Sequence, residues 1–491
     1  MPRVTIFSAC LALAALAPCS ATSQSISVYQ TTPDLVEALA EHQALNFADP
    51  AGAAANAPVI AVDDTQRFQV IDGFGASLTD AAAWLFAAKL PPAQASATFK
   101  SLFSRQDGIA VSFLRQPIGS SDLSVTVYSY DDLCAQTATP CTTPSNVTDY
   151  GLEHFSLKHD QLYILPELKL ALALNPDLKV ILSPWSPPGW MKTTGSMLGG
   201  NSQTHETSSL RPKAYNAFAN YLVKTIQGYQ AAGVPVYGVT MQNEPLYPPP
   251  TYSGMIMLAS DQAKFLVNDF GPALAAAHLT PKVMIYDFNW NYPDYPVAVL
   301  KDPKAYALAA GTAWHHYNGK PSEMAKNHQE FPEKDQWVTE ASGSTEQRGN
   351  ILAEEATELV DVTRNWAKSY VLWALATDQL RGPHVGGCAV CRGLVTIDLS
   401  DPNKPTVRRE ADYYVIGHAS KFVAPGAVRI ASDEPAGTQL KDVAFRNPDG
   451  TIVLYTVNKG KASQPILIGF HGKTAATTLP AGAVATFVWK P

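Results

Sequence analysis

Eight short runs rich in apolar and β-branched residues follow one another along the chain. They are Phe68–Gly73, Ile109–Arg115, Lys179–Pro184, Val236–Gln242, Lys282–Tyr286, Gly311–His316, Gln336–Thr339 and Tyr370–Ala374. Helical patterns separate most of these runs, and several runs are almost continuously apolar, as parallel strands buried on both faces should be. Strand and helix alternating eight times predict a (β/α)8 TIM barrel; an open doubly wound sheet is the alternative with the same periodicity.

Both ends of the chain carry a different pattern. From Val428 onward, short alternating strands are joined by turn-forming Pro-Asp-Gly at 448–450 and Asn-Lys-Gly at 458–460, which predicts an antiparallel β module. Two earlier runs, Ser25–Tyr29 and Val59–Val62, would add strands to it and make a β-sandwich that is discontinuous in sequence. The predicted domains are 22–67 for the N-terminal sandwich strands, 68–422 for the barrel and 423–491 for the C-terminal sandwich.

The first 21 residues have the pattern of an export signal. Arg3 precedes an apolar run at 7–17, and small residues surround a cleavage position after Ala21. A first core helix is the alternative interpretation. No later stretch reaches the roughly 18 uninterrupted apolar residues of a membrane span. We therefore expect a secreted or periplasmic protein without an integral membrane segment.

Four of the six cysteines lie outside the predicted export signal. Cys134 and Cys141 flank a polar loop, and Cys388 and Cys391 form a Cys-x-x-Cys pair. An even number in an exported protein favours two local disulfides, Cys134–Cys141 and Cys388–Cys391. A four-cysteine zinc site would use the same residues, but the six residues between the first two cysteines fit zinc poorly. A thioredoxin-like role is weaker still, because no evident helix begins at Cys388. We expect neither a metal nor a cofactor.

Charge and composition exclude other classes of protein. Charged residues make up 16% of the chain, against roughly 25% in an average globular protein, which is the opposite of a disordered composition. The formal charge is −7 and Lys and Arg form no runs, so a nucleic-acid partner is not expected. The chain is rich in aromatic residues, which suit stacking on the flat faces of sugars as well as core packing.

Functional residues of barrel enzymes gather at the carboxyl ends of the strands. At these positions the chain carries Arg115, Asp122, Trp185, Asn243, Glu244, His315, Tyr317, Glu340 and Trp373. The two carboxylates, Glu244 after the fourth run and Glu340 after the seventh, come from roughly opposite sides of one barrel. A single glutamate there is more often a cap or a surface residue. Two carboxylates on either side of a sugar, in contrast, are the minimum that hydrolysis of a glycosidic bond requires.

Several motifs occur in the order of a known family. They are IDGFGASLTD at 71–80, LRQPIGSSD at 114–122, SPWSPPGWMK at 183–192, QNEP at 242–245, TEA at 339–341 and GHASKF at 417–422. On these motifs the chain resembles glycoside hydrolase family 30, which contains the glucosylceramidases and the β-1,6-glucanases. The resemblance runs from about residue 25 to the carboxyl end. It implies a (β/α)8 barrel beside a β-sandwich built from both chain ends.

The resemblance also implies roles for the candidate residues. Glu244 looks like the acid/base and Glu340 like the nucleophile of a retaining β-glycosidase, with Asn243 holding the sugar 2-hydroxyl. Asp122 and Trp185 resemble the family's contacts to other sugar hydroxyls.

The remaining candidates would support this machinery. Trp373 resembles the family's hydrophobic floor. Arg115 is placed to keep Glu340 ionised and Tyr317 to donate a hydrogen bond to it. His315 matches a family position without an assignable role. Asp80, which precedes three alanines, is expected to be a structural helix cap.

Three departures from the family leave the substrate open. The glucosylceramidases carry Asn at the position of Ala374, their loop differs from His-Val-Gly-Gly-Cys-Ala-Val-Cys at 384–391, and the family has Trp where this chain has His316. These positions line the leaving-group side. The candidate substrates are therefore a β-linked glucan such as β-1,6-glucan, a glycolipid such as glucosylceramide, or a β-xyloside or β-fucoside.

Other classes of activity find less support. A sugar-binding barrel that has lost catalysis is the main alternative, although both carboxylates and their supporting Arg and Tyr are present. A serine hydrolase would need a G-x-S-x-G elbow, which the sequence lacks. A metalloenzyme would need H-E-x-x-H or a similar motif, whereas His315 and His316 are adjacent on a strand and would face opposite sides.

Overall fold

The computed structural model describes residues 1–2, 24–49, 57–133, 143, 146–200, 206–344 and 349–491. Eight parallel strands form a closed barrel, in which the last strand pairs with the first. They are β4 (Gly73–Ser77), β5 (Phe113–Ile118), β6 (Lys179–Pro184), β7 (Val236–Thr240), β8 (Lys282–Asn289), β9 (Gly311–His315), β10 (Asp335–Ala341) and β11 (Ala367–Leu372). The predicted (β/α)8 barrel is thereby confirmed and the open sheet is excluded.

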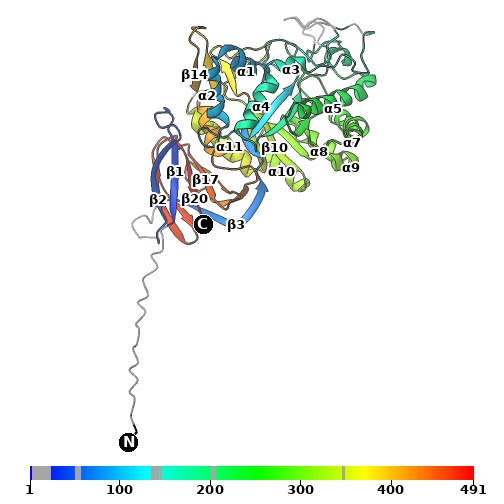
Figure 1. Cartoon of the computed structure of the whole chain (residues 1–491). Helices are drawn as coiled ribbons and strands as arrows, with labels where there is room; N and C mark the ends of the chain where they lie inside the picture. The colour runs from blue at the N-terminus through cyan, green and yellow to red at the C-terminus, as the bar shows by residue number, and fades with distance from the viewer. Residues whose placement is uncertain (3–23, 50–56, 134–142, 144–145, 201–205, 345–348) are drawn as a thin grey trace.

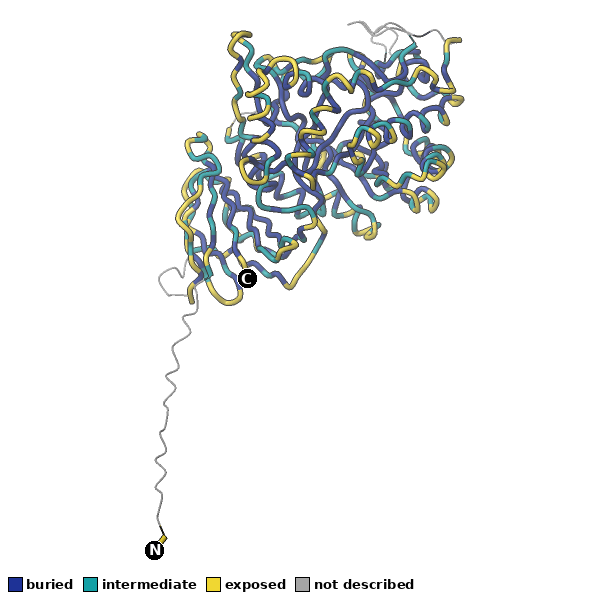
Figure 2. Tube along the Cα trace, in the orientation of Figure 1, coloured by how far each residue is buried: buried dark blue, intermediate teal, exposed yellow. Residues whose placement is uncertain are grey.

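Helices surround this barrel on its outside (Figure 1). The longer ones are α2 (Pro92–Phe103), α4 (Ile164–Leu174), α5 (Tyr215–Ala231), α10 (Ser322–Glu330), α11 (Ile351–Arg364) and α12 (Ala411–Ser420). The strands are dark blue in Figure 2 because helices cover their outer faces and side chains fill the interior. The interior of the barrel is filled by a separate apolar cluster with one residue from each of six strands: Phe113, Ile181, Met284, Ala313, Trp337 and Val371. Within the described part of the chain, no helix has the length and apolar character needed to cross a membrane.

The two ends of the chain meet in one nine-stranded sheet, ordered β19-β18-β3-β15-β16-β17-β20-β1-β2. The N-terminal strands are β1 (Ser25–Thr31), β2 (Ala40–Asn46) and β3 (Val59–Val70), and the C-terminal strands are β15 (Val428–Ser432), β16 (Leu440–Arg446), β17 (Ile452–Asn458), β18 (Gln464–Phe470), β19 (Lys473–Leu479) and β20 (Val484–Trp489). A bridge between Ala48 and Thr474 brings the two edges together, so the sheet curls around its own apolar core. The discontinuous sandwich is confirmed, and in Figure 1 it lies beside the barrel.

The prediction of the first barrel strand was wrong. Of the predicted run Phe68–Gly73 only Gly73 enters the barrel, because β3 extends to Val70 and pairs with β15 of the sandwich. The first barrel strand is the following segment, Gly73–Ser77, which has few of the β-branched residues that mark strands. Small residues are required there: a Cβ on Gly75 would lie 2.0 Å from the carbonyl oxygen of Phe113 on the neighbouring strand.

Candidate active site

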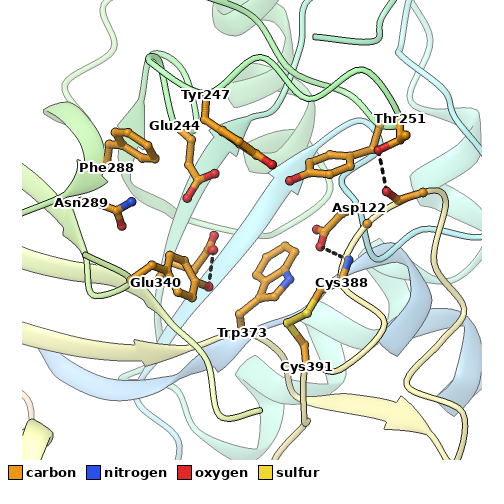
Figure 3. Close-up of a pocket in the computed structure, with 14 residues that line it drawn as sticks. Asp122, Glu244, Tyr247, Thr251, Phe288, Asn289, Glu340, Trp373, Cys388 and Cys391 are labelled. Carbon is orange, nitrogen blue, oxygen red and sulfur yellow. Dashed lines mark hydrogen bonds between the residues drawn. A yellow bond between two sulfur atoms is a disulfide. The ribbon is translucent and has the colours of Figure 1, made fainter. Parts of the chain in front are cut away.

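A pocket of about 480 Å³ opens at the carboxyl end of the barrel strands. Its wall includes the predicted residues Asp122, Glu244, Tyr317, Glu340 and Trp373 (Figure 3). These side chains reach the pocket from four barrel strands or the loops that follow them: β5, β7, β9 and β10, with Trp373 directly after β11. Sequence-distant residues therefore meet at one site, as the strand-end argument predicts.

Strand periodicity explains why these side chains point into the barrel mouth. Residues two positions apart on a strand share a face, so each residue two positions after an interior core residue lies one layer higher. Arg115 follows the core residue Phe113 in this way, and Trp373 follows Val371. The same spacing puts His315 two positions after Ala313. The site is thus the layer of side chains directly above the hydrophobic filling of the barrel.

Three carboxylates of the site, those of Asp287, Glu340 and Glu244, lie at local irregularities of the backbone. The register of β8 shifts between Tyr286 and Phe288, and Asp287 at the shift has a φ of 70°. The register of β10 shifts between Val338 and Glu340. Glu244 itself has a φ of 45°. Positive φ is uncommon in residues other than glycine and is concentrated at functional sites.

Glu244 and Glu340 face each other across the pocket (Figure 3). One carboxylate oxygen of each lies within 4.8 Å of the other, and a ring nitrogen of His315 lies within the same distance of both. Glu340 is 5% exposed. Arg115 Nη1 donates a hydrogen bond to Glu340 Oε2, and the Tyr317 hydroxyl donates one of 2.7 Å to Oε1. Glu340 is thereby held in one orientation by two donors.

Asp287 is a site residue that the sequence analysis missed. Its buried carboxylate accepts hydrogen bonds from the side chains of Arg115, Ser183, Thr240 and Thr339, and it lies 3.0 Å from His315 Nε2. Burial alone would raise the pKa of Asp287, but Arg115 and His315 lower it well below its usual range. Asp287 stands near the carboxyl end of β8 (Lys282–Asn289) and directly follows the predicted run Lys282–Tyr286, so its strand-end position is visible in the sequence.

His315 joins Asp287 to Glu244. Its Nδ1 lies 3.1 Å from Glu244 Oε1. Burial would lower the pKa of His315, yet the carboxylates of Glu340, Asp287 and Glu244 raise it to about 9, so both ring nitrogens carry protons at neutral pH. Burial raises the pKa of Glu244 above its usual value, although His315 counteracts part of this effect. The two glutamates therefore differ in their nearest cation: the Arg115 guanidinium donates a hydrogen bond to Glu340, whereas Glu244 contacts His315.

Three other predicted residues lie behind the pocket wall. Arg115 is fully buried, and its Nη2 donates a hydrogen bond of 2.7 Å to Asn243 Oδ1. Trp185 stacks on Trp373 with ring centroids 4.9 Å apart, and the guanidinium carbon of Arg115 lies 4.5 Å from the centre of the Trp185 ring. Neither Trp185 nor Asn243 is among the residues that line the pocket. They support Trp373 and Arg115, and the sugar contacts expected of them stay predictions.

Asp80 is structural, but the prediction that it is a helix cap was wrong. Thr79 is the N-cap of α1 (Asp80–Trp84), and its hydroxyl accepts a hydrogen bond from the Ala82 N–H. Asp80 is the first helical residue, and its carboxylate is bound by the segment at Val125 and by the α3 region (Lys158–Leu162) instead of by N–H groups of its own helix. It accepts hydrogen bonds from the Val125 N–H and the Tyr163 hydroxyl, and it contacts His159.

The Cys388–Cys391 disulfide is present and forms part of the pocket wall. Cys134 and Cys141, the second predicted pair, lie outside the described residues.

The closed barrel, the paired glutamates at its mouth and the attached sandwich define a barrel glycoside hydrolase. The family model of the glycosyl hydrolase family 30 TIM-barrel domain matches residues 71–423, and that of the family's β-sandwich domain matches residues 426–487. The chain belongs to glycosyl hydrolase family 30.

Relatives of this chain include endo-1,6-β-glucanases and glucosylceramidases. The chain is 35% identical to an endo-1,6-β-D-glucanase of Neurospora crassa over 416 aligned residues. The alignment covers 82% of this chain and 81% of the relative. It is 31% identical to putative glucosylceramidase 4 of Caenorhabditis elegans over 419 aligned residues. This alignment covers 82% of this chain and 76% of the relative. The solved structure of the endo-β1,6-glucanase BT3312 superposes with a TM-score of 0.82 at 32% identity, covering 95% of this chain and all of that one.

Proposed function

We propose that the protein is a retaining β-glucosidase that cleaves β-1,6-linked glucan by double displacement. The observation that carries this proposal is the separation of the two carboxylates: oxygens of Glu244 and Glu340 lie within 4.8 Å of each other. Retaining enzymes hold their carboxyl groups about 5–5.5 Å apart, whereas inverting enzymes need about 6.5–9.5 Å to admit a water molecule between carboxylate and sugar. The spacing in this chain suits direct attack.

In the first step, Glu340 attacks the anomeric carbon while Glu244 protonates the departing oxygen. The carbon–oxygen bond to the leaving group breaks, a bond to a Glu340 oxygen forms, and the proton of Glu244 leaves with the alcohol. Burial raises the pKa of Glu244, which favours the protonated form that this step requires. Arg115 and Tyr317 direct the Glu340 carboxylate and stabilise its charge.

In the second step, water replaces the enzyme at the anomeric carbon. Glu244, now ionised, takes one proton from the water, whose oxygen bonds to the sugar as the bond to Glu340 breaks. The protonated His315, 3.1 Å from Glu244, stabilises the anionic form of Glu244 between the two steps. Two inversions give a product with the configuration of the substrate.

The proposed substrate rests on the relatives and on the pocket. Two endo-1,6-β-D-glucanases, from Neurospora crassa and Aspergillus fumigatus, are 35% and 33% identical to this chain. We assign the sugar contacts to Asp122, Trp373 and Asn243, with Trp185 behind Trp373. The second candidate substrate is a glucosylceramide, because the chain is also similar to a putative glucosylceramidase. The export pattern at residues 1–21 supports action outside the cytoplasm, in a secreted or periplasmic location.

A substrate panel with an anomer readout tests this proposal. Purified enzyme is assayed on β-1,6-glucan, glucosylceramide, and the nitrophenyl β-glucoside, β-xyloside and β-fucoside. Proton NMR of the first minutes of hydrolysis is expected to show the β-anomer of the product. A matched pair of variants separates chemistry from folding: Glu340→Gln is expected to be inactive, and the exposed Glu330→Gln fully active. Release of the α-anomer first would overturn the mechanism, and hydrolysis of glucosylceramide without that of β-1,6-glucan would overturn the substrate.

A further inference from the structure

Residues 384–391, which we call the disulfide loop, form one wall of the pocket. The loop lies between β12 (Ala376–Asp378) and β13 (Val395–Asp398), and it contains neither helix nor extended strand. Four of its residues line the pocket: Gly386, Gly387, Cys388 and Cys391. The two cysteines also pack in a small apolar cluster with Trp185 and Trp373. An irregular segment therefore stands directly beside the sugar-binding side chains.

The disulfide loop holds Asp122 from two directions. The Cys388 N–H donates a hydrogen bond of 3.3 Å to the Asp122 carboxylate, and the Val385 N–H donates one of 2.9 Å to the Asp122 carbonyl (Figure 3 shows the first). Gly387 makes the closest approach: a Cβ at this position would lie 2.0 Å from the Asp122 Cβ. Only glycine permits the loop to lie this close to Asp122.

Both sides of the loop are themselves fixed to the barrel mouth. On one side, the Thr251 hydroxyl donates a hydrogen bond of 2.7 Å to the Gly386 carbonyl, where φ is +70°. On the other side, the backbone of Cys391 forms an isolated antiparallel β-bridge with that of Ser344. The Arg392 N–H donates a hydrogen bond to the Gly343 carbonyl. The loop thus joins the segment that follows Glu340 to the segment that carries Asp122.

We propose that the disulfide loop is a positioning element, in which the Cys388–Cys391 bond keeps the loop in the one conformation that holds Asp122 against the sugar. The inference rests on the proposed function. Without a cross-link, an eight-residue segment that lacks helix and strand and contains two glycines would have many conformations, and the Cys388–Cys391 bond restricts the half of it that donates to the Asp122 carboxylate. The positioned group is Asp122; the cysteines act through it.

The electrostatics of Asp122 agree with this role. Burial and the charge of Glu340 raise its pKa to about 7, and Glu244 adds to this effect. The hydrogen bonds from the Cys388 and Leu123 N–H groups act in the opposite direction. The other titratable groups near this carboxylate are the hydroxyls of Tyr252 and Tyr317. Release of the loop removes one of the few contacts that favour ionised Asp122.

A double-mutant cycle tests the inference. Cys388→Ser with Cys391→Ser is expected to lower kcat/KM on nitrophenyl β-glucoside about tenfold, the effect of weakening one hydrogen bond to a charged group. The acid limb of the pH profile of kcat/KM is expected to move to higher pH. In an Asp122→Ala background the same cysteine changes are expected to cost nothing further, because the group they position is gone. The proposal would be overturned if the double-serine change lowered kcat/KM by the same factor in the Asp122→Ala background as in the wild type. An unchanged kcat/KM in the double-serine variant would also overturn it.

Two further measurements keep the inference testable if the serine variant folds poorly. Dithiothreitol is expected to lower the activity of the wild-type enzyme, with loss of the bond checked by peptide mapping, and to leave the serine variant unaffected. Gly387→Ala is expected to lose activity about tenfold or more, whereas Gly151→Ala, whose added Cβ would meet no atom closer than 3.5 Å, keeps it. Full activity of the reduced enzyme would contradict the inference. A wild-type enzyme inactive on every β-glycoside would instead refute the proposed function.

Discussion

At the scale of single residues, Glu244 and Glu340 are chemically identical side chains that their neighbours make different. Glu340 receives the guanidinium of Arg115 and the hydroxyl of Tyr317. Glu244 has His315 as its charged neighbour, and burial raises its pKa. A glutamate whose pKa is raised by burial suits the acid, and one held in place by two hydrogen-bond donors suits the nucleophile.

Replacement of either glutamate tests this division of roles. Glu340→Gly is expected to reduce turnover by a factor on the order of 10⁴ or more, because no covalent intermediate forms. Azide added to this variant attacks from the vacated side, restores cleavage of activated β-glucosides and gives an α-glucosyl azide. Glu244→Ala is expected to lose about 10²–10⁴-fold on substrates with poor leaving groups and less on nitrophenyl glycosides, with azide giving the β-product. Reversed stereochemistry of the two azides would exchange the assignments.

His315 makes stability depend on pH at the alkaline side. Its pKa in the folded protein is about 9, above the ordinary value of 6.5. The charged form is therefore favoured by folding, so its contribution is complete below pH 6.5 and is lost as the pH rises through about 9. We expect a loss of roughly 3 kcal/mol in unfolding free energy over this range. Urea unfolding at pH 6 and pH 9 measures it; the His315→Gln variant should show a clearly smaller difference between the two pH values.

At the scale of elements, the strands that the sequence made predictable are those rich in β-branched residues. The strand Gly73–Ser77 was missed because its sequence, Gly-Phe-Gly-Ala-Ser, is set by close approach to its neighbour and not by β-propensity. The register shifts in β8 and β10 depend on how partner strands pair, which no single strand's sequence reports. Asp287 was missed although it directly follows the fifth predicted run, Lys282–Tyr286, where its strand-end position is visible in the sequence. Strand-end positions, in contrast, identified Glu244 and Glu340 because their location follows from barrel topology alone.

A glycine replacement in β4 tests the packing explanation. Gly75→Ala would place its Cβ 2.0 Å from the Phe113 carbonyl oxygen, a backbone atom that cannot move without separating the two strands. We expect a loss of about 1–3 kcal/mol or more in unfolding free energy. Gly151→Ala serves as the control, since its Cβ would make only ordinary contacts. Equal unfolding midpoints for the two variants would show that β4 tolerates a larger residue.

At the scale of the whole molecule, barrel and sandwich share buried polar contacts. His418 of α12 lies between the two: its Nδ1 is 2.9 Å from Thr486 Oγ1 on β20, and its Nε2 is 2.8 Å from Thr31 Oγ1 on β1. Arg364 of α11 donates hydrogen bonds to Ser432 and to the Asp442 carbonyl. The sandwich is therefore joined to the barrel through α11 and α12, which pack against β11 and β4, the last and first strands of the barrel.

The His418 contact predicts sensitivity to acid. Burial lowers the pKa of His418 to about 3 from 6.5, so folding favours the neutral form. Its contribution is complete above pH 6.5 and is lost as the pH falls toward 3, by at most roughly 5 kcal/mol. His418→Gln keeps a donor and an acceptor but does not titrate. We expect the variant to lose less stability than the wild type between pH 7 and pH 4 in urea unfolding; parallel losses would contradict this.

Removal of the sandwich is expected to abolish solubility. A fragment of residues 70–425 lacks β1, β2, nearly all of β3 and every strand from β15 to β20. The faces of α11 and α12 that contact the sandwich would be exposed. Size-exclusion chromatography of the expressed fragment should show aggregates or no soluble protein. A monomeric fragment with wild-type activity would refute this expectation.

The pairing of β1 with β20 also sets the order in which the molecule is completed during its synthesis. Every barrel strand has left the ribosome soon after Leu372, but β1 meets its partner only when Val484–Trp489 has been made. β2 follows β1 at once and can pair with one edge of it, but at about 5–20 residues per second the other edge waits roughly 20–90 s for β20. Such edges recruit other strands. The newly made N-terminal hairpin is therefore open to pairing with other strands for as long as the rest of the chain takes to appear.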